Sequence, residues 1–188
     1  MSIQVSLKRI NTRDPLFAPS LELMNSSFIE DERRNEDELR TLADNNMIFA
    51  FNVIEADGNR AGIITTWNFG KFIYVEHFAT EPNLRNKGIG ISTLQLLASS
   101  SALPIVLEVE PELSSPEAAR RISFYERAGF HLWQTPYIQP PYNQGKNSLP
   151  MNLMAHNLEE TQECTQIVKA LLYKHVYKVK SVDFPLPF

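Results

Sequence analysis

The sequence lacks several features that would each indicate a particular class of protein. It has one cysteine among 188 residues, Cys164, so no internal disulfide can form, and this favours a reducing compartment such as the cytoplasm. Its apolar runs are short and interrupted, far below the ~20 residues that a membrane-spanning helix needs. The first ten residues, MSIQVSLKRI, contain no apolar segment typical of a signal peptide. We therefore expect a cytoplasmic protein without membrane association.

The chain also lacks an excess of positive charge. Its 18 Lys and Arg are outnumbered by 22 Asp and Glu, giving a formal net charge of −4, and this gives no support to nucleic-acid binding. The histidines and the cysteine show no spacing typical of a metal site, so we expect no metal. With 43% hydrophobic and 21% charged residues, the chain is long and apolar enough for one domain with a sizeable core.

The spacing of apolar residues predicts a mixed α/β domain. Strands are expected at 3–9, 47–55, 60–69, 72–80, 105–110, 130–133 and 148–154. Helices are expected from Asp14 or Pro19 to about Phe28, and at about 35–44, 88–101, 116–128 and 158–178. Residues 47–80 form an antiparallel meander, whereas a helix joins the strands at 72–80 and 105–110, which should therefore be parallel neighbours. We expect one domain over residues 1–155 and a C-terminal helical extension, 156–188, packed on it.

The most informative stretch joins the strand at 72–80 to the helix that follows it. The connecting turn holds two basic residues and two glycines: Arg85, Lys87, Gly88 and Gly90. A helix N-terminus attracts anions through its unpaired N–H groups and its dipole, and glycines let the backbone approach a phosphate closely. The turn is neither a G-x-x-x-x-G-K-[ST] loop nor a G-x-G-x-x-G fingerprint. The turn is therefore either a different kind of phosphate-binding site or an ordinary strand-to-helix turn.

This turn reads R-x-x-G-x-G, with the residues Arg85, Asn86, Lys87, Gly88, Ile89 and Gly90. It resembles the pyrophosphate loop of the GNAT superfamily of N-acetyltransferases. A second segment, FYERAGF at 124–130, resembles the "FYxxxGF" segment of the same family. Two such segments in the family's order and spacing favour the family over an ordinary turn. The resemblance covers roughly residues 45–155 and implies a GNAT-like sheet in which the two parallel strands splay apart.

The resemblance implies that the protein uses acetyl-CoA as a cosubstrate and transfers its acetyl group directly to a primary amine. The R-x-x-G-x-G turn would hold the diphosphate. The thioester arm would lie between the splayed strands and pair with the backbone of Phe78, Ala79 and Thr80. Tyr125, in the second segment, would be the general acid that gives a proton to the departing thiolate. A non-catalytic GNAT-like module that binds acyl-CoA as a regulator is the alternative.

Two carboxylates compete for the role of general base. Glu76 lies four residues before Thr80, and the period of two along a strand places both on one face of the sheet, opposite His77. Glu108, in IVLEVE, matches the glutamate of a family "LEV" segment. Some family members carry their base at one or the other position, so the sequence leaves both open. Each glutamate could instead be a structural or substrate-orienting charge.

The acceptor itself cannot be read from the sequence and could be a small-molecule amine or a peptide amine. Residues 135–147, rich in Pro, Tyr and Gln, are predicted to form a long loop that either covers the acceptor site or is an ordered surface loop. The acidic residues Glu30, Asp31 and Glu32 are either a solvated surface or contacts for a cationic substrate. The final helix could dock on its own domain or on a second copy, so monomer and homodimer both remain open.

Overall fold

A computed structural model of the chain describes residues 3–180. Its strands are β1 (Val5–Ile10), β2 (Phe49–Ala56), β3 (Asn59–Asn68), β4 (Ile73–Thr80), β5 (Ile105–Val109), β6 (His131–Leu132), β7 (Tyr137–Gln139) and β8 (Leu149–His156). Its α-helices are α1 (Phe17–Ser27), α2 (Glu36–Asn45), α3 (Ile89–Ser100), α4 (Pro116–Arg127) and α5 (Gln162–Leu171). Short 3-10 turns are η1 (Glu30–Glu32), η2 (Pro82–Leu84) and η3 (Glu112–Ser114), and a π-helical turn, η4 (Leu172–Val176), ends α5. No helix in this described range is long and apolar enough to cross a membrane.

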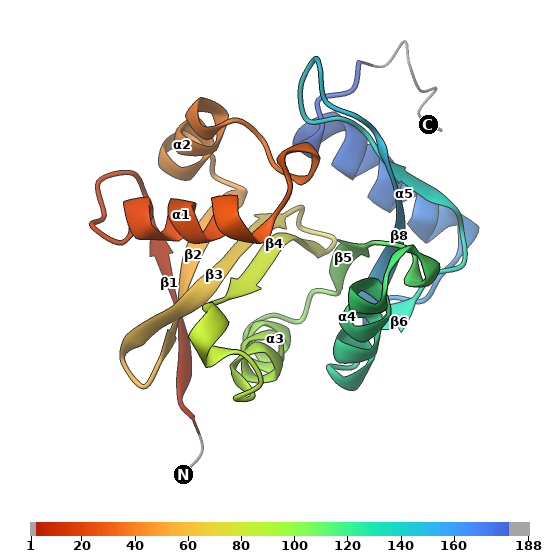
Figure 1. Ribbon diagram of the computed structural model, residues 1–188. Coiled ribbons are helices and arrows are strands. Elements are labelled where there is room, and N and C mark those ends of the chain that lie inside the picture. The colour runs from red at the N-terminus through yellow and green to blue at the C-terminus, as the bar shows by residue number, and fades with distance from the viewer. Residues whose placement is uncertain (1–2, 181–188) are drawn as a thin grey trace.

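The strands form one sheet in the order β1-β2-β3-β4-β5-β8-β6, and β7 pairs with β8 outside this path. Every pairing is antiparallel except that of β4 with β5, because α3 carries the chain from the end of β4 back to the start of β5. Figure 1 shows the two strands separating near the centre of the molecule. The predicted fold class is confirmed: a mixed, mostly antiparallel sheet with one parallel pair, flanked by helices.

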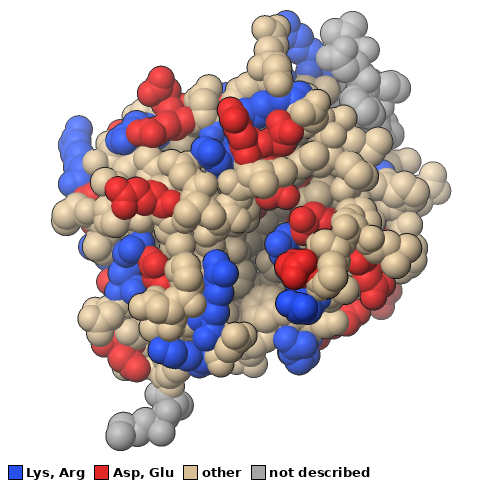
Figure 2. Space-filling view, in the orientation of Figure 1, with Lys and Arg blue, Asp and Glu red and all other residues tan. Residues whose placement is uncertain are grey.

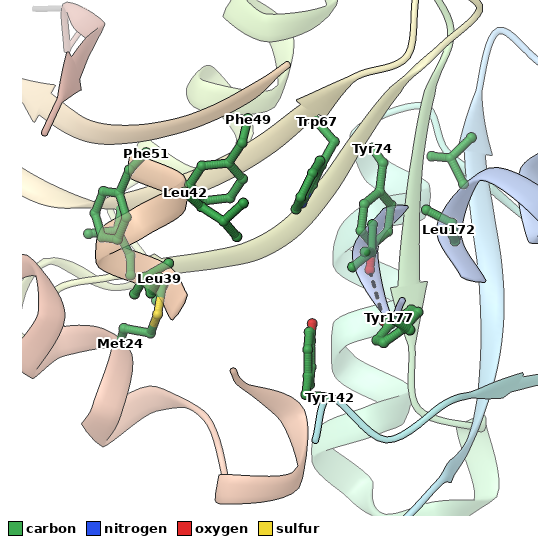
Figure 3. Close-up of a cluster of buried hydrophobic side chains, with 14 of the residues drawn as sticks. Met24, Leu39, Leu42, Phe49, Phe51, Trp67, Tyr74, Tyr142, Leu172 and Tyr177 are labelled. Carbon is green, nitrogen blue, oxygen red and sulfur yellow. Dashed lines mark hydrogen bonds between the residues drawn. The ribbon is translucent and has the colours of Figure 1, made fainter. Parts of the chain in front are cut away.

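The core consists of two apolar clusters, one on each face of the sheet. One face buries Phe49, Phe51 and Trp67 under α1 and α2, and Figure 3 shows Met24 and Leu39 beneath these rings. The turn after α5 adds residues such as Leu172 and Tyr177 to this same cluster. The other face buries residues of β2 to β5, including Ile54, Ile64, Val75 and Leu107, under Leu94 of α3 and Ile122 of α4. Because the central strands are covered on both sides, they read as nearly continuous apolar runs.

A β-bulge in β4 marks the point where the parallel pair comes apart. Thr65 pairs with His77 and Thr66 with Val75, so Glu76 is an extra residue in β4 with no counterpart in β3. On the other side, β4 pairs with β5 only from Ile73 to Val75. A bulge bends its strand and increases the local twist. The main chain of β4 therefore leaves β5 directly after Val75, and the two strands splay.

The bulge shows that the predicted orientation of Glu76 was wrong. Glu76 was expected to share a face with Thr80 and to lie opposite His77. Instead, the Glu76 carboxylate accepts a hydrogen bond from Trp67, and His77 Nδ1 lies 3.2 Å from Thr65 Oγ1, so both point to the face that carries Thr65 and Trp67. Strict alternation resumes only after the bulge, and it places Thr80 on the opposite face.

The C-terminal third differs from expectation in two places. Residues 135–147 are not entirely a loop, because β7 pairs with β8 through Tyr137 and Met151. The last helix begins at Gln162, four residues later than predicted, where the Thr161 side chain accepts from the Cys164 N–H as an N-cap. The last residues of the predicted C-terminal extension, 181–188, lie outside the described residues.

Gly62 offers a test of how closely β3 and β4 pack. A Cβ atom at Gly62 would lie 2.3 Å from the carbonyl oxygen of Ala79, which belongs to the neighbouring backbone and cannot rotate away. We expect Gly62→Ala to lower the free energy of unfolding by about 1–3 kcal/mol, as overpacking does elsewhere. Chemical denaturation measures this, with Gln95→Ala on the exposed side of α3 as the control that stays within about 0.5 kcal/mol. Equal midpoints for both variants would contradict the close packing.

Candidate active site

A cleft of about 660 Å³ opens where β4 and β5 separate. It is bounded by β4 from Val75 to Thr80, by the turn that leads into α3, and by α4. Figure 2 shows a central hollow with Lys and Arg side chains on both sides and Asp and Glu side chains above it. The structure brings the predicted site residues together: Glu76, Phe78, Ala79, Thr80, Arg85, Asn86, Gly88, Ile89, Gly90, Glu108 and Tyr125 all line the cleft. Lys87 lies in the same turn but does not line it.

At one end of the cleft, the turn before α3 is shaped by two glycines with different tasks. Gly88, the N-cap residue, has φ +83°, a left-handed conformation that other residues adopt only with strain. Gly90 leaves room for Phe124, whose ring a Cβ would approach to 3.0 Å. No side chain caps the first-turn N–H groups of α3. With Arg85 on this side and Arg120 of α4 also lining the cleft, this end suits an anion such as a diphosphate.

The middle of the cleft exposes the free edge of β4. After Val75 the strand keeps β3 on one side and has no β5 partner on the other. The side chain of Glu76 is completely buried although the residue as a whole is half-buried, so its exposed surface is main chain. Unpaired N–H and C=O groups at a strand edge accept an extended chain as an additional strand. An extended ligand that carries amide groups fits such an edge.

Tyr125 reaches the cleft from α4, opposite β4. Ser115 caps this helix by accepting from the N–H of Ala118, and the ring of Tyr125 packs edge-on against Phe124 and Phe130. Burial raises the pKa of Tyr125 to about 12, against a smaller opposing effect of the Arg121 charge. The hydroxyl therefore keeps its proton at neutral pH, as a general acid must, but the same shift makes it a weaker acid than an ordinary tyrosine.

Hydrogen-bond donors surround the Glu76 side chain and keep it ionised. It forms an ion pair with Arg34, and it accepts from Trp67 Nε1 at 2.8 Å and from the Tyr142 hydroxyl at 3.0 Å. Burial alone would raise the pKa of Glu76, but the Arg34 charge, together with the nearby imidazole of His77 and these hydrogen bonds, lowers it below its ordinary value. A carboxylate so well satisfied is a poor acceptor for a further proton near neutral pH.

Arg34 is itself fully buried and contacts three segments of the chain. Its guanidinium binds Glu76, donates to Glu38 Oε1 at 2.9 Å, and lies over the rings of Trp67 and Tyr142 at 5.5 and 5.0 Å. Burial lowers the pKa of Arg34, but Glu76, Tyr142 and Glu38 together raise it by more, so the side chain stays charged. This residue links the start of α2 to the bulge of β4 and to the β7–β8 connection.

Glu108 has a different environment from Glu76, because its partners are neutral hydroxyls. The Tyr177 hydroxyl donates to Glu108 Oε2 at 2.6 Å, and the Tyr137 hydroxyl donates to Oε1. Tyr74 lies behind, 3.3 Å from the Tyr177 hydroxyl, as the dashed line in Figure 3 shows. Burial raises the pKa of Glu108 to about 7, although the tyrosine hydrogen bonds oppose the shift. A carboxylate with this pKa can accept a proton at neutral pH.

A segment that we call the strap, residues 139–147 between β7 and β8, closes over the far end of the cleft. Lys146 Nζ donates to the carbonyl oxygens of Glu30 and Arg33, and Asn147 donates to the Asp31 carboxylate. Gln139 and Tyr142 of the strap line the cleft. The residues Glu30 and Asp31, which were open to two interpretations, thus hold the strap in place.

Comparison with known proteins identifies the family. Residues 47–132 match a family model described as an acetyltransferase (GNAT) domain. A GNAT-family acetyltransferase structure from Bacteroides thetaiotaomicron is 41% identical, with a TM-score of 0.88, and the match covers 93% of this chain and 99% of the other. The chain belongs to the GNAT acetyltransferase family.

More distant GNAT structures share the fold. Naa50 from Arabidopsis thaliana, in complex with the bisubstrate analogue CoA-Ac-MVNAL, is 15% identical with a TM-score of 0.56, covering 82% of this chain and 99% of that one. The ribosomal-protein-S18-alanine N-acetyltransferase from Escherichia coli is 17% identical with a TM-score of 0.56, covering 85% and 97%. Among curated proteins, no match was found.

Several polar residues of this GNAT site were missed by sequence reasoning. Arg34 stands in a run of charged residues that reads as a solvated surface, and no local pattern indicates its burial. Tyr177 lies in a helix predicted only from its apolar stripe. In contrast, Tyr142 belongs to the segment proposed as a cover for the acceptor site. Within residues 3–180, no group of three or more His, Cys, Asp and Glu residues is placed to hold a metal ion.

The buried ion pair predicts a large and specific effect on stability. Arg34→Met leaves the Glu76 carboxylate buried without its partner, so the free energy of unfolding should fall by about 3–5 kcal/mol in urea denaturation. Arg120→Ala, which breaks an exposed ion pair with Glu117, should cost about 0.5 kcal/mol or less. The double variant Arg34→Met/Glu76→Gln should recover part of the loss. If it is less stable than Arg34→Met alone, the two charges do not depend on each other.

Proposed function

We propose that the protein is an N-acetyltransferase that moves an acetyl group from acetyl-CoA to a primary amine by direct transfer. The observation that carries this proposal is the cleft of a GNAT-family chain in which the free edge of β4 leads from the N-terminus of α3 to Glu108. One end suits a diphosphate, the edge suits the pantetheine arm, and the other end holds a carboxylate that can take a proton. The single cysteine, present as a free thiol, favours a cytoplasmic location.

Binding of the cosubstrate would use backbone more than side chains. The N–H groups of the Arg85–Gly90 turn and of the first turn of α3 would receive the diphosphate, and the main chain of Phe78, Ala79 and Thr80 would pair with the arm. Acetyl-CoA would supply an activated thioester carbonyl. A GNAT protein from Elizabethkingia anophelis was solved with acetyl-CoA bound, and an acetyltransferase from Bacillus subtilis in complex with CoA, which supports the choice of ligand.

Three groups of the chain would carry the chemistry. Glu108 accepts the proton that the amine must lose to become a nucleophile, directly or through a water. A main-chain N–H of β4 donates to the carbonyl oxygen as negative charge develops there. Tyr125 then gives its proton to the thiolate of CoA as the carbon–sulfur bond breaks. We assign the base to Glu108 rather than Glu76, because Arg34 holds Glu76 as a buried structural carboxylate.

Ligand binding tests the cosubstrate assignment. CoA or acetyl-CoA at about 100 times its dissociation constant should stabilise the protein by roughly 2.7 kcal/mol, visible as a higher thermal midpoint, whereas ATP should not. Gly88→Ala should weaken this effect, because a Cβ atom strains the left-handed conformation at φ +83°. A midpoint that CoA leaves unchanged in the wild type would refute the assignment.

The pH dependence of turnover tests the base. As a base, Glu108 works only when deprotonated, so kcat/KM should be full above its pKa of about 7 and should fall as the pH drops through that value. Glu108→Gln should abolish transfer while keeping CoA binding. Tyr177→Phe removes a hydrogen bond that favours the charged carboxylate, so the pKa of Glu108 should rise. The pH at which kcat/KM falls on the acidic side of the profile should then be higher by about one unit.

A matched comparison comes from the π-helical turn that precedes Tyr177. Tyr173 is also buried, and its hydroxyl donates to the carbonyl oxygen of Ile138 at 2.6 Å, so Tyr173→Phe should shift the acidic side of the pH profile less than Tyr177→Phe does. An active Glu108→Gln variant would remove Glu108 from the mechanism. CoA binding without turnover of any amine by the wild type would instead favour a non-catalytic acyl-CoA-binding module.

A further inference from the structure

The strap and η1 meet over the acceptor end of the cleft, and this closure restricts what can enter. Resting on the proposed function, we propose that the acceptor is a compact small-molecule amine and not the N-terminus of a polypeptide, because the strap bridges to η1 across the path that a peptide chain would take. The inference depends on the closure alone and not on which glutamate is the base.

The acceptor end of the cleft follows from the position of the other parts. The anion-binding turn before α3 lies at one end, and Glu108 lies toward the other. The residues that line the cleft beyond Glu108 come from the end of α1, from η1 and from the strap, and include Phe28, Glu32, Gln139 and Tyr142. An amine that reacts next to Glu108 therefore lies beside η1 and the strap.

Five hydrogen bonds join η1 and the residue after it to the strap. Lys146 Nζ donates to the Glu30 carbonyl at 2.6 Å and to the Arg33 carbonyl at 2.5 Å. The backbone and side-chain N–H groups of Asn147 donate to the two Asp31 carboxylate oxygens at 3.2 and 3.0 Å. At its other end, the strap donates from Gln139 Nε2 to the Asp31 carbonyl at 3.3 Å. Both ends of the strap are thereby tied to the same short segment.

Tyr142, in the middle of the strap, keeps the closure in place from inside. It is 7% exposed, its hydroxyl donates to Glu76, and its ring lies 4.9 Å from that of Tyr177 and 5.0 Å from the Arg34 guanidinium. Lifting the strap would expose this ring and remove a donor from the buried Glu76 carboxylate. Tyr142 thus anchors the strap in the core on this side.

The size of the cleft supports the same conclusion. Its volume of about 660 Å³ is in the range of about 300–1,000 Å³ that holds one drug-sized ligand. The thioester arm must occupy part of this space alongside β4. What remains beside Glu108 suits a small amine, whereas the main chain of a polypeptide would have to leave the cleft through the strap.

The test uses two conjugates in which CoA is joined through its acetyl group to an amine, in one case a short alkylamine and in the other a pentapeptide N-terminus. Calorimetry on the full chain measures their affinities relative to CoA, so the result does not depend on turnover. We expect the alkylamine conjugate to bind at least 10-fold more tightly than CoA, and the peptide conjugate to bind no more tightly than CoA. A peptide conjugate that binds as tightly as the alkylamine conjugate would overturn the proposal.

A strap variant shows whether the closure is the cause. Lys146→Ala/Asn147→Ala removes four of the bonds to η1 and its neighbour, so the peptide conjugate should gain at least 10-fold in affinity. Retained binding of the alkylamine conjugate shows that the variant is folded. The control is Lys169→Ala, since Lys169 Nζ donates to the Pro136 carbonyl outside the strap, and both affinities should stay unchanged. A strap variant that still rejects the peptide conjugate also overturns the proposal.

The same measurement separates this inference from the proposed function. If CoA itself does not bind, the assignment of the cosubstrate fails and the inference fails with it. If CoA and the peptide conjugate both bind tightly, the cosubstrate assignment stands and only the compact acceptor is wrong. Each outcome therefore has one meaning.

Discussion

The buried ion pair between Arg34 and Glu76 is the interaction on which the site depends. Removing two charges from water is costly, and their mutual attraction offsets this cost only when the geometry is good and the remaining donors and acceptors are satisfied. Here Glu38 accepts a further hydrogen bond from Arg34, and Trp67 and Tyr142 donate to Glu76. The Trp67 ring also covers the guanidinium. The net stabilisation by such a pair is small, but losing one partner is expensive. The pair therefore selects the one arrangement of α2, β4 and the strap in which all these groups meet.

One extra residue in β4 gives the site two properties at once. The bulge at Glu76 turns this side chain toward Arg34, and it also directs the strand away from β5, so that the edge from Glu76 to Thr80 is free. A regular strand would have kept its pairing with β5 and would have left no room for an extended ligand. The two glutamates consequently differ in environment, because Glu76 is fixed by a cation whereas Glu108 is surrounded by neutral tyrosine hydroxyls.

The fold and the cleft walls could be predicted because they follow from local patterns. Apolar periodicity indicated α3, Pro116 and Gly129 marked the two ends of α4, and the R-x-x-G-x-G turn lies at one end of the cleft, directly before α3. The orientation of Glu76 could not be predicted, because a bulge depends on which residues of β3 pair with β4. Most of the residues around Arg34 in the sequence are charged, as they commonly are around an exposed arginine. Its burial is a result of tertiary packing. The raised pKa of Glu108 depends on partners from distant parts of the chain, which no local pattern records.

The hydroxyl partners of Glu108 are synthesised later than most of the cleft. Glu108 receives its hydroxyl partners from residues that are 29 and 69 positions later in the chain, Tyr137 and Tyr177. A ribosome adds about 5–20 residues per second from the N-terminus, so β4, the Arg85–Gly90 turn and α4 are synthesised seconds before Tyr177 is. Until then the Glu108 carboxylate lacks the hydroxyl of Tyr177. Most of the cleft walls are therefore synthesised before the residue that completes the surroundings of Glu108.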